Sequence, residues 1–454
     1  MRKYLFFLSL LFLFNITFSQ KQVLYNFAEL PQSLLLNPAY ETNYKFHIGV
    51  PLISSFSSSF GSSGLVLSDL FGVDGRNIND KVSTVLNSLS TRDFFQLNTQ
   101  IEIFNGGFRL DDNNYLSFGF YHEIDAFSNY PKDLFLLFSE GNEVNRTFSA
   151  SQINYKVDYT GVLHFGLTRK INKQVTLGTR FKIYSSAANL ESNYNRGTFT
   201  TVQGTNNIYS HNFSNVDFEA RTSGLISNNE YIDDPTAFLK NTFLGGNLGF
   251  GLDFGVNLRI NDQLEFSASI LDLGFINHKE NIKNTKLEGD YVFEGVEFLY
   301  DESSSVNYWN QIDEQFKEQL PSTNNQESYI SWRPTKLNAA LKYSFGERRS
   351  KICYDNRYKD FYTDALGVQL FNVFRPGNQQ FSLTAFYQKS FSDKFQTKIT
   401  YTLDDFSLYN LGAGISTQIG NINFYGMVDN ILEFRNLAKA NSISLHFGFN
   451  LLFN

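Results

Sequence analysis

The chain has 454 residues and a formal net charge of −7, with 48 Phe and 25 Tyr but only 8 Pro. The acidic balance excludes a broad basic surface, so nucleic acid is not expected as a partner. The aromatic composition favours strands and suits the aromatic girdles of membrane barrels. Cys353 is the only cysteine, which excludes an internal disulfide and leaves either a free thiol or an ordinary strand or turn residue.

The first twenty residues predict a secretory signal peptide. Arg2 and Lys3 precede an apolar run from Tyr4 to Phe14, and Thr17-Phe18-Ser19 forms a small-x-small cleavage site. The apolar run is too short for a comfortable transmembrane helix. We therefore expect residues 1–19 to be removed and residues 20–454 to form one domain, which begins with a periplasmic segment, residues 20–43, that leads into the first strand.

From Tyr44 onward, alternation of apolar and polar residues predicts antiparallel strands. The clearest example is 246–260, where Leu248, Phe250 and every second residue to Ile260 share one face, opposite Gly, Asp, Asn and Arg. Turn residues separate the predicted arms. The predicted strands are 44–60, 96–110, 115–124, 152–170, 174–189, 246–260, 264–270, 335–345, 362–374, 380–391, 395–403, 406–418, 422–431 and 442–454. The turns at 171–175 and 260–264 share an I-N-x-Q-apolar pattern, which suggests hairpins at the same rim.

The last strand, 442–454, alternates over its whole length and ends in aromatic residues, which is typical of outer-membrane barrels. A sheet can span lipid only if it closes, because every backbone group must then be paired. Short turns on one side and long loops on the other predict about 14 strands, with both termini on the short-turn side. The range is about 12 to 16, because residues 197–220 could supply another pair. The predicted fold is all-β, a transmembrane antiparallel up-and-down barrel; the alternative is a soluble sandwich or propeller, for which no blade-length repeat is visible.

Three segments in the long loops have helical spacing and predict short inserts. They are 65–92, with Val82, Val85, Leu86 and Leu89; 234–239, with Pro235 in the first turn; and 309–320, with Trp309, Ile312, Phe316 and Leu320. Such helices could act as a lid or a lumen plug, or could simply pack on the barrel rim.

Motifs for catalysis and for metal or cofactor binding are not found, so we expect no enzyme and name no catalytic, cofactor or metal residue. The six histidines are far apart in sequence and form no H-E-x-x-H pattern: His47, His122, His164, His211, His278 and His446. His164 or His446 could sterically serve an outer-membrane phospholipase, although a lone inward histidine is more often a lumen residue. Asp301 to Ser305 could touch Ca²⁺ or form a solvated loop.

Several polar residues are predicted to point into the lumen. They are Arg180, Asp253, Asn257, Arg259, Lys398 and Asp429. A charged lumen could select a permeant solute. It could equally be filled by an internal salt-bridge network, since buried charges must be paired.

Some motifs resemble known families. Leu36-Asn37-Pro38-Ala39 resembles the N-P-A element near the start of long-chain fatty-acid transporter-like (FadL-like) barrels and of barrels linked to gliding and type IX secretion. Four further segments, 165–174, 271–276, 403–407 and 425–430, are similar to an uncharacterised Bacteroidota family known only as a domain of unknown function. The resemblance covers nearly all of the mature chain and implies an outer-membrane barrel. It transfers no fatty-acid contact residue.

These features together predict a location in the cell outer membrane, with membrane lipid as a partner and no cofactor. The leading hypothesis is passage of a small or hydrophobic solute across that membrane. The rival hypothesis is a structural or interaction barrel that anchors a secretion, gliding or cell-surface complex through periplasmic or surface proteins.

Overall fold

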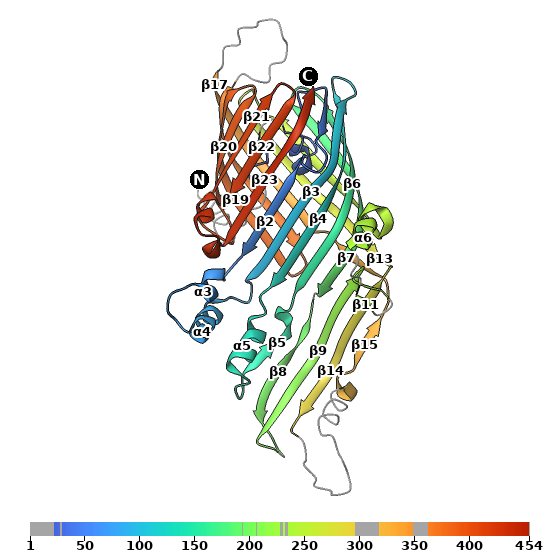
Figure 1. Ribbon diagram of the computed structural model, residues 1–454, viewed down its shortest axis with the longest axis vertical. Coiled ribbons are helices and arrows are strands. Elements are labelled where there is room, and N and C mark those ends of the chain that lie inside the picture. The colour runs from blue at the N-terminus through green and yellow to red at the C-terminus, as the bar shows by residue number, and fades with distance from the viewer. Residues whose placement is uncertain are drawn as a thin grey trace, which may run out of the picture.

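A computed structural model describes residues 22–453, apart from 28–29, 193, 206, 228–229, 232–234, 296–316 and 348–361. Several features predicted from the sequence lie outside the described residues: the signal peptide, Cys353, Asp301 to Ser305 and most of the helix predicted at 309–320. Figure 1 shows a tall barrel with tilted strands, short turns at the end that carries the C-terminus, and a lobe built from long loops at the other end.

The wall has 14 antiparallel strands, as predicted. In order around the barrel they are β1 (Phe46–Gly49) with β2 (Phe56–Ser62), β3 (Phe94–Arg109), β4 (Asn114–Asn129), β6 (Tyr155–Lys170), β7 (Val175–Ser192), β12 (Asn247–Arg259), β13 (Leu264–His278), β16 (Tyr329–Trp332) with β17 (Thr335–Glu347), β18 (Tyr362–Arg375), β19 (Asn378–Ser392), β20 (Phe395–Leu403), β21 (Asn410–Ile419), β22 (Ile422–Asp429) and β23 (Ser442–Phe453). The barrel closes where β23 pairs with β1 and β2, with Phe453 opposite Phe46 and Phe447 opposite Phe56.

The predicted orientation of the alternating rows is confirmed. Along β12, Leu248, Phe250, Leu252 and Phe254 are 42–49% exposed, whereas Asp253 between them is fully buried. The apolar face of this strand therefore points outward and its polar face lines the lumen.

The shared turn pattern has a physical cause. The side-chain oxygen of Asn172 accepts hydrogen bonds from the backbone N–H groups of Gln174 and Val175, both at 2.8 Å. Asn261 accepts in the same way from Gln263 and Leu264, at 2.9 and 2.8 Å. Each Asn closes an Asx turn, and both turns lie at the short-turn rim.

Residues 197–220 do form strands, but not in the wall. β8 (Arg196–Gln203) and β9 (Tyr209–Ser223) join β14 (Ile282–Phe293), β15 (Ser322–Asn325) and β5 (Thr147–Ser149) in a sheet that extends past the long-loop rim. We call this sheet the external lobe; beside it the small hairpin of β10 (Ile226–Ser227) and β11 (Glu230–Tyr231) pairs separately. On β9, Asp217, Glu219 and Arg221 share a face, which could not face lipid.

The helices are short, and among the described residues none is long and apolar enough to cross a membrane. They are α2 (Ser33–Leu36), α3 (Leu67–Phe71), α4 (Ile78–Ser88), α5 (Lys132–Glu140) and α6 (Pro235–Lys240), with the shorter turns η1 (Ala150–Gln152), η2 (Asn241–Gly245), η3 (Ile431–Arg435) and η4 (Leu437–Lys439). α3 and α4 fill the insert predicted at 65–92, and α6 lies at the one predicted at 234–239. Val85 and Leu86 of α4 and Leu89, which follows it, pack with Leu136 of α5 and Phe148 of β5, so this insert packs at the base of the external lobe rather than in the lumen.

Candidate functional site

The N-terminal segment from Gln22 to Tyr44, expected to lead into the barrel, lies inside it, and we call it the plug. Leu24, Phe27 and Leu30 are at most 1% exposed and pack with Tyr425 and Met427 of β22. Farther along, Leu34 and Tyr44 pack with Tyr115 and Leu452 of the wall. The lumen at this level is therefore filled by the chain's own apolar residues.

The N-P-A tripeptide rests on two wall glycines that face each other, Gly178 of β7 and Gly255 of β12. A Cβ at Gly178 would lie 2.0 Å from the Pro38 carbonyl carbon, and one at Gly255 would lie 2.1 Å from Asn37 Oδ1. Thr168 Oγ1 donates to the Pro38 carbonyl at 2.6 Å. Glycine is needed at both wall positions because the plug backbone approaches the wall backbone directly.

Wall side chains pair with the backbone carbonyls that the plug cannot pair itself. A four-residue helix such as α2 leaves its last carbonyls without helical partners. Arg180 donates to the Leu34 and Leu35 carbonyls, the latter at 3.2 Å, and Ser269 Oγ donates to Leu36 at 2.6 Å. Lys398 donates to the Tyr25 carbonyl at 2.6 Å. Two of the predicted lumen cations therefore hold the plug.

Gln32 joins the plug to an irregularity in the wall. Residues 50–55 interrupt the strand formed by β1 and β2, and Leu52 and Ile53 there are 60% and 46% exposed. The Gln32 amide donates to the Ser54 carbonyl at 3.2 Å and to Glu102 Oε2 at 3.1 Å, and it exchanges two 3.0 Å bonds with Asn450. This side chain is fully buried, so removing it would take both of these bonds from the Asn450 amide and one bond each from the Ser54 carbonyl and Glu102.

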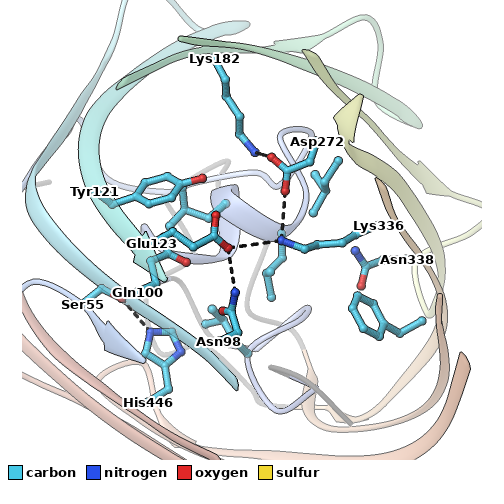
Figure 2. A pocket seen from close by; sticks show the side chains of 15 residues that line it. Ser55, Asn98, Gln100, Tyr121, Glu123, Lys182, Asp272, Lys336, Asn338 and His446 are labelled. Atoms are coloured by element: carbon cyan, nitrogen blue, oxygen red, sulfur yellow. Dashed lines mark hydrogen bonds and ion pairs between the residues drawn. The ribbon is translucent and has the colours of Figure 1, made fainter. Parts of the chain in front are cut away.

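On the long-loop side of the plug, charged side chains link strands of the wall. Lys182 lies between Asp253 and Asp272, at 2.9 and 2.6 Å, and Lys336 lies between Asp272 and Glu123, at 3.0 and 3.7 Å. Figure 2 shows this chain of contacts from Lys182 to Asn98. Arg180 and Asp253, each predicted to point inward, form an ion pair at 3.0 Å that joins this chain through Lys182. Buried cations and carboxylates are equal in number among the described luminal ion pairs: Lys156, Arg180, Lys182, Arg333, Lys336 and Arg375 against Glu123, Asp125, Asp158, Glu191, Asp253 and Asp272.

Of the other predicted inward residues, Asn257 and Arg259 lie near the short-turn end of β12, whereas Asp429 ends β22 on the long-loop side. Asp429 accepts from Ser444 Oγ at 2.5 Å. Asn257 has a buried side-chain oxygen, and Arg259 follows it on the same face of β12. The equal numbers of cations and carboxylates in these ion pairs favour a packed lumen with paired charges over a field that selects ions of one sign.

Opposite walls also touch at the long-loop mouth. Arg375, at the end of β18, donates to both carboxylate oxygens of Asp125 on β4, at 2.9 and 3.1 Å. Asn154 Nδ2 donates to the Pro376 carbonyl at 3.1 Å. Nearby, Phe406 packs against Phe94 with ring centroids 5.4 Å apart. β4 and β18 are the third and ninth strands of the wall, so these contacts cross the lumen.

Between the plug and the mouth lies a small internal cavity. The space open to the centre of a water-sized sphere is about 50 Å³, enough for a few waters. Its lining contains both apolar and polar side chains. The apolar ones are Leu24, Leu35, Leu36, Leu271 and Phe371, and the others are Ser55, Asn98, Gln100, Tyr121, Glu123, Lys182, Asp272, Lys336, Asn338 and His446. Sequence reasoning missed this cavity, because its apolar part comes largely from the plug, which has no strand periodicity.

The histidines stay apart, and the described residues contain no group of three or more His, Cys, Asp or Glu arranged to hold a metal. His164 is buried in the wall. His446 Nε2 lies 2.8 Å from Ser55 Oγ and 3.1 Å from the Tyr425 hydroxyl. This serine–histidine contact joins residues 391 positions apart, so it could not be foreseen from the sequence. Ser55 is 2% exposed, and both side chains line the small internal cavity.

A family model described as "Family of unknown function (DUF5723)" matches residues 38–429. The chain belongs to this family. No curated protein matches the chain. The DUF5723 match runs from Pro38 in the plug to Asp429 at the end of β22. It therefore includes Gly178 and Gly255 under the N-P-A tripeptide, which we call the glycine seat, as well as the luminal ion pairs and the external lobe.

Among solved structures, this DUF5723 chain is similar to three barrels. A Pseudomonas aeruginosa FadL homologue has 10% identity over 94% of this chain and 95% of its own, with a TM-score of 0.44. The Ralstonia pickettii toluene transporter TbuX has 10% identity over 97% and 100%, with a TM-score of 0.41. The translocator domain of the autotransporter NalP from Neisseria meningitidis has 8% identity over 91% of each chain, with a TM-score of 0.33.

Proposed function

We propose that this protein is an outer-membrane β-barrel that admits a small solute when its N-terminal plug moves. The membrane location rests on the outward apolar rows, which continue around the whole wall and have no other partner in a soluble molecule. Examples from different strands, all 39–52% exposed, are Phe118, Phe165, Leu341, Val368, Ile399 and Leu445. Residues 1–19 are proposed to be the signal peptide that directs export.

The observation that carries the gating proposal is how the plug is held. Its contacts with the wall are side-chain hydrogen bonds and packing, as at Gln32, Asn37 and Lys398. In the seated state the plug and the cross-luminal contacts occupy the lumen around the small cavity, so passage requires displacement of the plug. The mixed apolar and polar lining of that cavity favours a solute with both an apolar and a polar part.

The test uses a reversible lock on the plug. A Cβ at Gly414 of β21 would lie 2.5 Å from Val23 Cγ1, so cysteines at these positions are within disulfide reach. The variant V23C/G414C is made in a C353S background and reconstituted in liposomes. We expect solute-driven swelling in the reduced protein and its loss on oxidation. The single variant V23C, oxidised in parallel, is the control. A folded reduced barrel that admits no solute of any class would contradict the proposal.

The external lobe favours a second function, docking of a surface protein. Five strands drawn from three loops build a sheet that solute passage does not require. Crosslinking on intact cells followed by affinity capture tests this function. A lobe partner recovered with a barrel that is closed to solutes would favour it over passage.

A further inference from the structure

Two short segments lie on the flank of the barrel and expose apolar side chains. One is α6 with η2, residues 235–245; the other is η3 with η4, residues 431–439. We call them the collar segments. Figure 1 shows α6 beside the wall rather than across its mouth. η3 lies against β21 and β23, and α6 with η2 lies against β6 and β7, so the segments occupy different sides of the barrel.

The segment α6–η2 is fixed to the outer surface of the wall. Thr242 is fully buried, its hydroxyl is 3.1 Å from His122 Nε2, and a Cβ at Gly161 of β6 would come within 2.1 Å of its carbonyl oxygen. The Phe243 ring packs 4.8 Å from that of Phe120 on β4. Ser185 Oγ donates to the Asn241 carbonyl at 2.5 Å. The irregular backbone of η2 is therefore seated on the wall.

Each collar segment also exposes apolar surface away from the protein. In α6–η2, Leu239 and Leu244 are 48% and 49% exposed, and the Phe243 ring remains 55% exposed beside Phe120. In η3–η4 the exposed apolar side chains are Ile431, Leu432, Phe434 and Leu437, at 41–54%. Each segment also carries exposed cations: Lys240 in the first, Arg435 and Lys439 in the second. Apolar side chains next to cations are the pattern of a segment that lies in the plane of a membrane interface.

The position of the collar segments along the barrel also supports a location at the membrane interface. Nine residues separate Lys170, at the short-turn end of β6, from Gly161 under Thr242. Nine residues also separate Ile422, at the short-turn end of β22, from Ile431. A tilted strand needs about 9–11 residues to cross the hydrocarbon layer. Both segments thus lie at the long-loop border of the apolar belt and continue it.

We propose that the two collar segments are in-plane membrane anchors that insert their exposed apolar side chains into the lipid leaflet on the long-loop side. This inference rests on the membrane location given under the proposed function. The anchors fix the depth of the barrel, so that the external lobe stands clear of the membrane.

The test places single spin-labelled cysteines at Phe243 and Leu432 in a C353S background, in proteoliposomes. Collision with oxygen, which dissolves in lipid, is compared with collision with a water-soluble nickel chelate. Label sites at Phe250, in the apolar belt, and Ile208, 74% exposed in the external lobe, are the lipid and water references. L244C replaces F243C if the latter fails to fold. We expect oxygen-to-nickel ratios at both collar sites close to the Phe250 value and well above the Ile208 value.

Two results would overturn the inference, and they differ. If the oxygen-to-nickel ratios at the collar sites equal that at Ile208 while the ratio at Phe250 is lipid-like, the collar segments are not membrane anchors, but the membrane location of the barrel still holds. A water-like oxygen-to-nickel ratio at Phe250 itself would contradict the proposed membrane location and therefore the anchors as well.

Discussion

The glycine seat under the N-P-A tripeptide gives the sharpest prediction, the substitution Gly178→Ala. The new Cβ would lie 2.0 Å from the Pro38 carbonyl carbon, where carbon atoms normally keep about 3.5 Å. The plug backbone must therefore retreat by about 1.5 Å. That movement breaks the bond from Thr168 to the Pro38 carbonyl and strains the contact between Asn37 and Val256.

The cost combines overpacking of about 1–3 kcal/mol with about 1 kcal/mol for each lost hydrogen bond. A net change of about 3 kcal/mol lowers the ratio of seated to released plug by roughly 150-fold. The wall strands keep their pairing, so the barrel itself still folds. The matched control is Gly426→Ala, also in a wall strand, where the nearest atom to the new Cβ is 3.8 Å away.

The assay is maleimide labelling of Ser33→Cys, a 1% exposed plug position, in a C353S background, with liposome swelling measured in parallel. We expect G178A to label faster and to swell liposomes more than either the wild type or G426A. Heat-modifiable migration checks that each barrel is folded. A folded G178A barrel whose plug stays as protected as in G426A would refute the reasoning about the seat.

Three further predictions follow from other contacts. Gln32→Leu should lower the free energy of unfolding by about 2–4 kcal/mol, because the buried Asn450 amide loses both of its bonds to Gln32 and Glu102 loses one; an unchanged melting temperature would be the contrary result. Arg375→Gln should lower the urea midpoint, because it leaves buried Asp125 without its cation at a cost of about 3–5 kcal/mol; D125N/R375Q should recover most of the loss. Hydrogen bonds from Lys81 and Arg76 hold the pKa of Asp74 well below its usual range. The ionised Asp74 should therefore stabilise the loop between α3 and α4 from neutral pH down to about pH 4, and this effect should be lost as the pH falls further. Limited proteolysis of this loop at several pH values, compared between the wild type and D74N, measures the loss.

The wall was predictable because lipid and lumen impose a strict two-residue period on every strand that crosses. The row from Leu248 to Phe254 shows this directly, and Asn172 and Asn261 marked the turns through side-chain bonds that need no tertiary context. The strand count followed from the same signals. The external lobe was not placed correctly, because strands outside the membrane have no lipid to enforce the period; β14 went unpredicted, and β8 and β9 were allowed as wall strands.

The plug was missed for a related reason. Leu24, Phe27 and Leu30 are enclosed on all sides, so neither a strand nor a helix period orders them. The available signals were indirect: the N-P-A tripeptide, and Gly255 on the inner face of β12, where the plug approaches the wall. The partners of Arg180 and Lys398 could not be foreseen, because the carbonyls they hold belong to that unpredicted segment.

The hydrogen bonds of the wall and those of the plug are largely separate, so the plug proposed to block the lumen can move without unfolding the barrel. Each wall strand pairs with two neighbours, so the backbone bonds of the barrel form a closed set that does not include the plug. Release of the plug therefore leaves those bonds intact and exposes only side-chain donors such as Arg180 and Lys398, together with a few plug carbonyls, to water that can replace the lost partners. The apolar cluster around Phe27 is what resists release, and a solute with an apolar part could offset that loss by occupying the same surface.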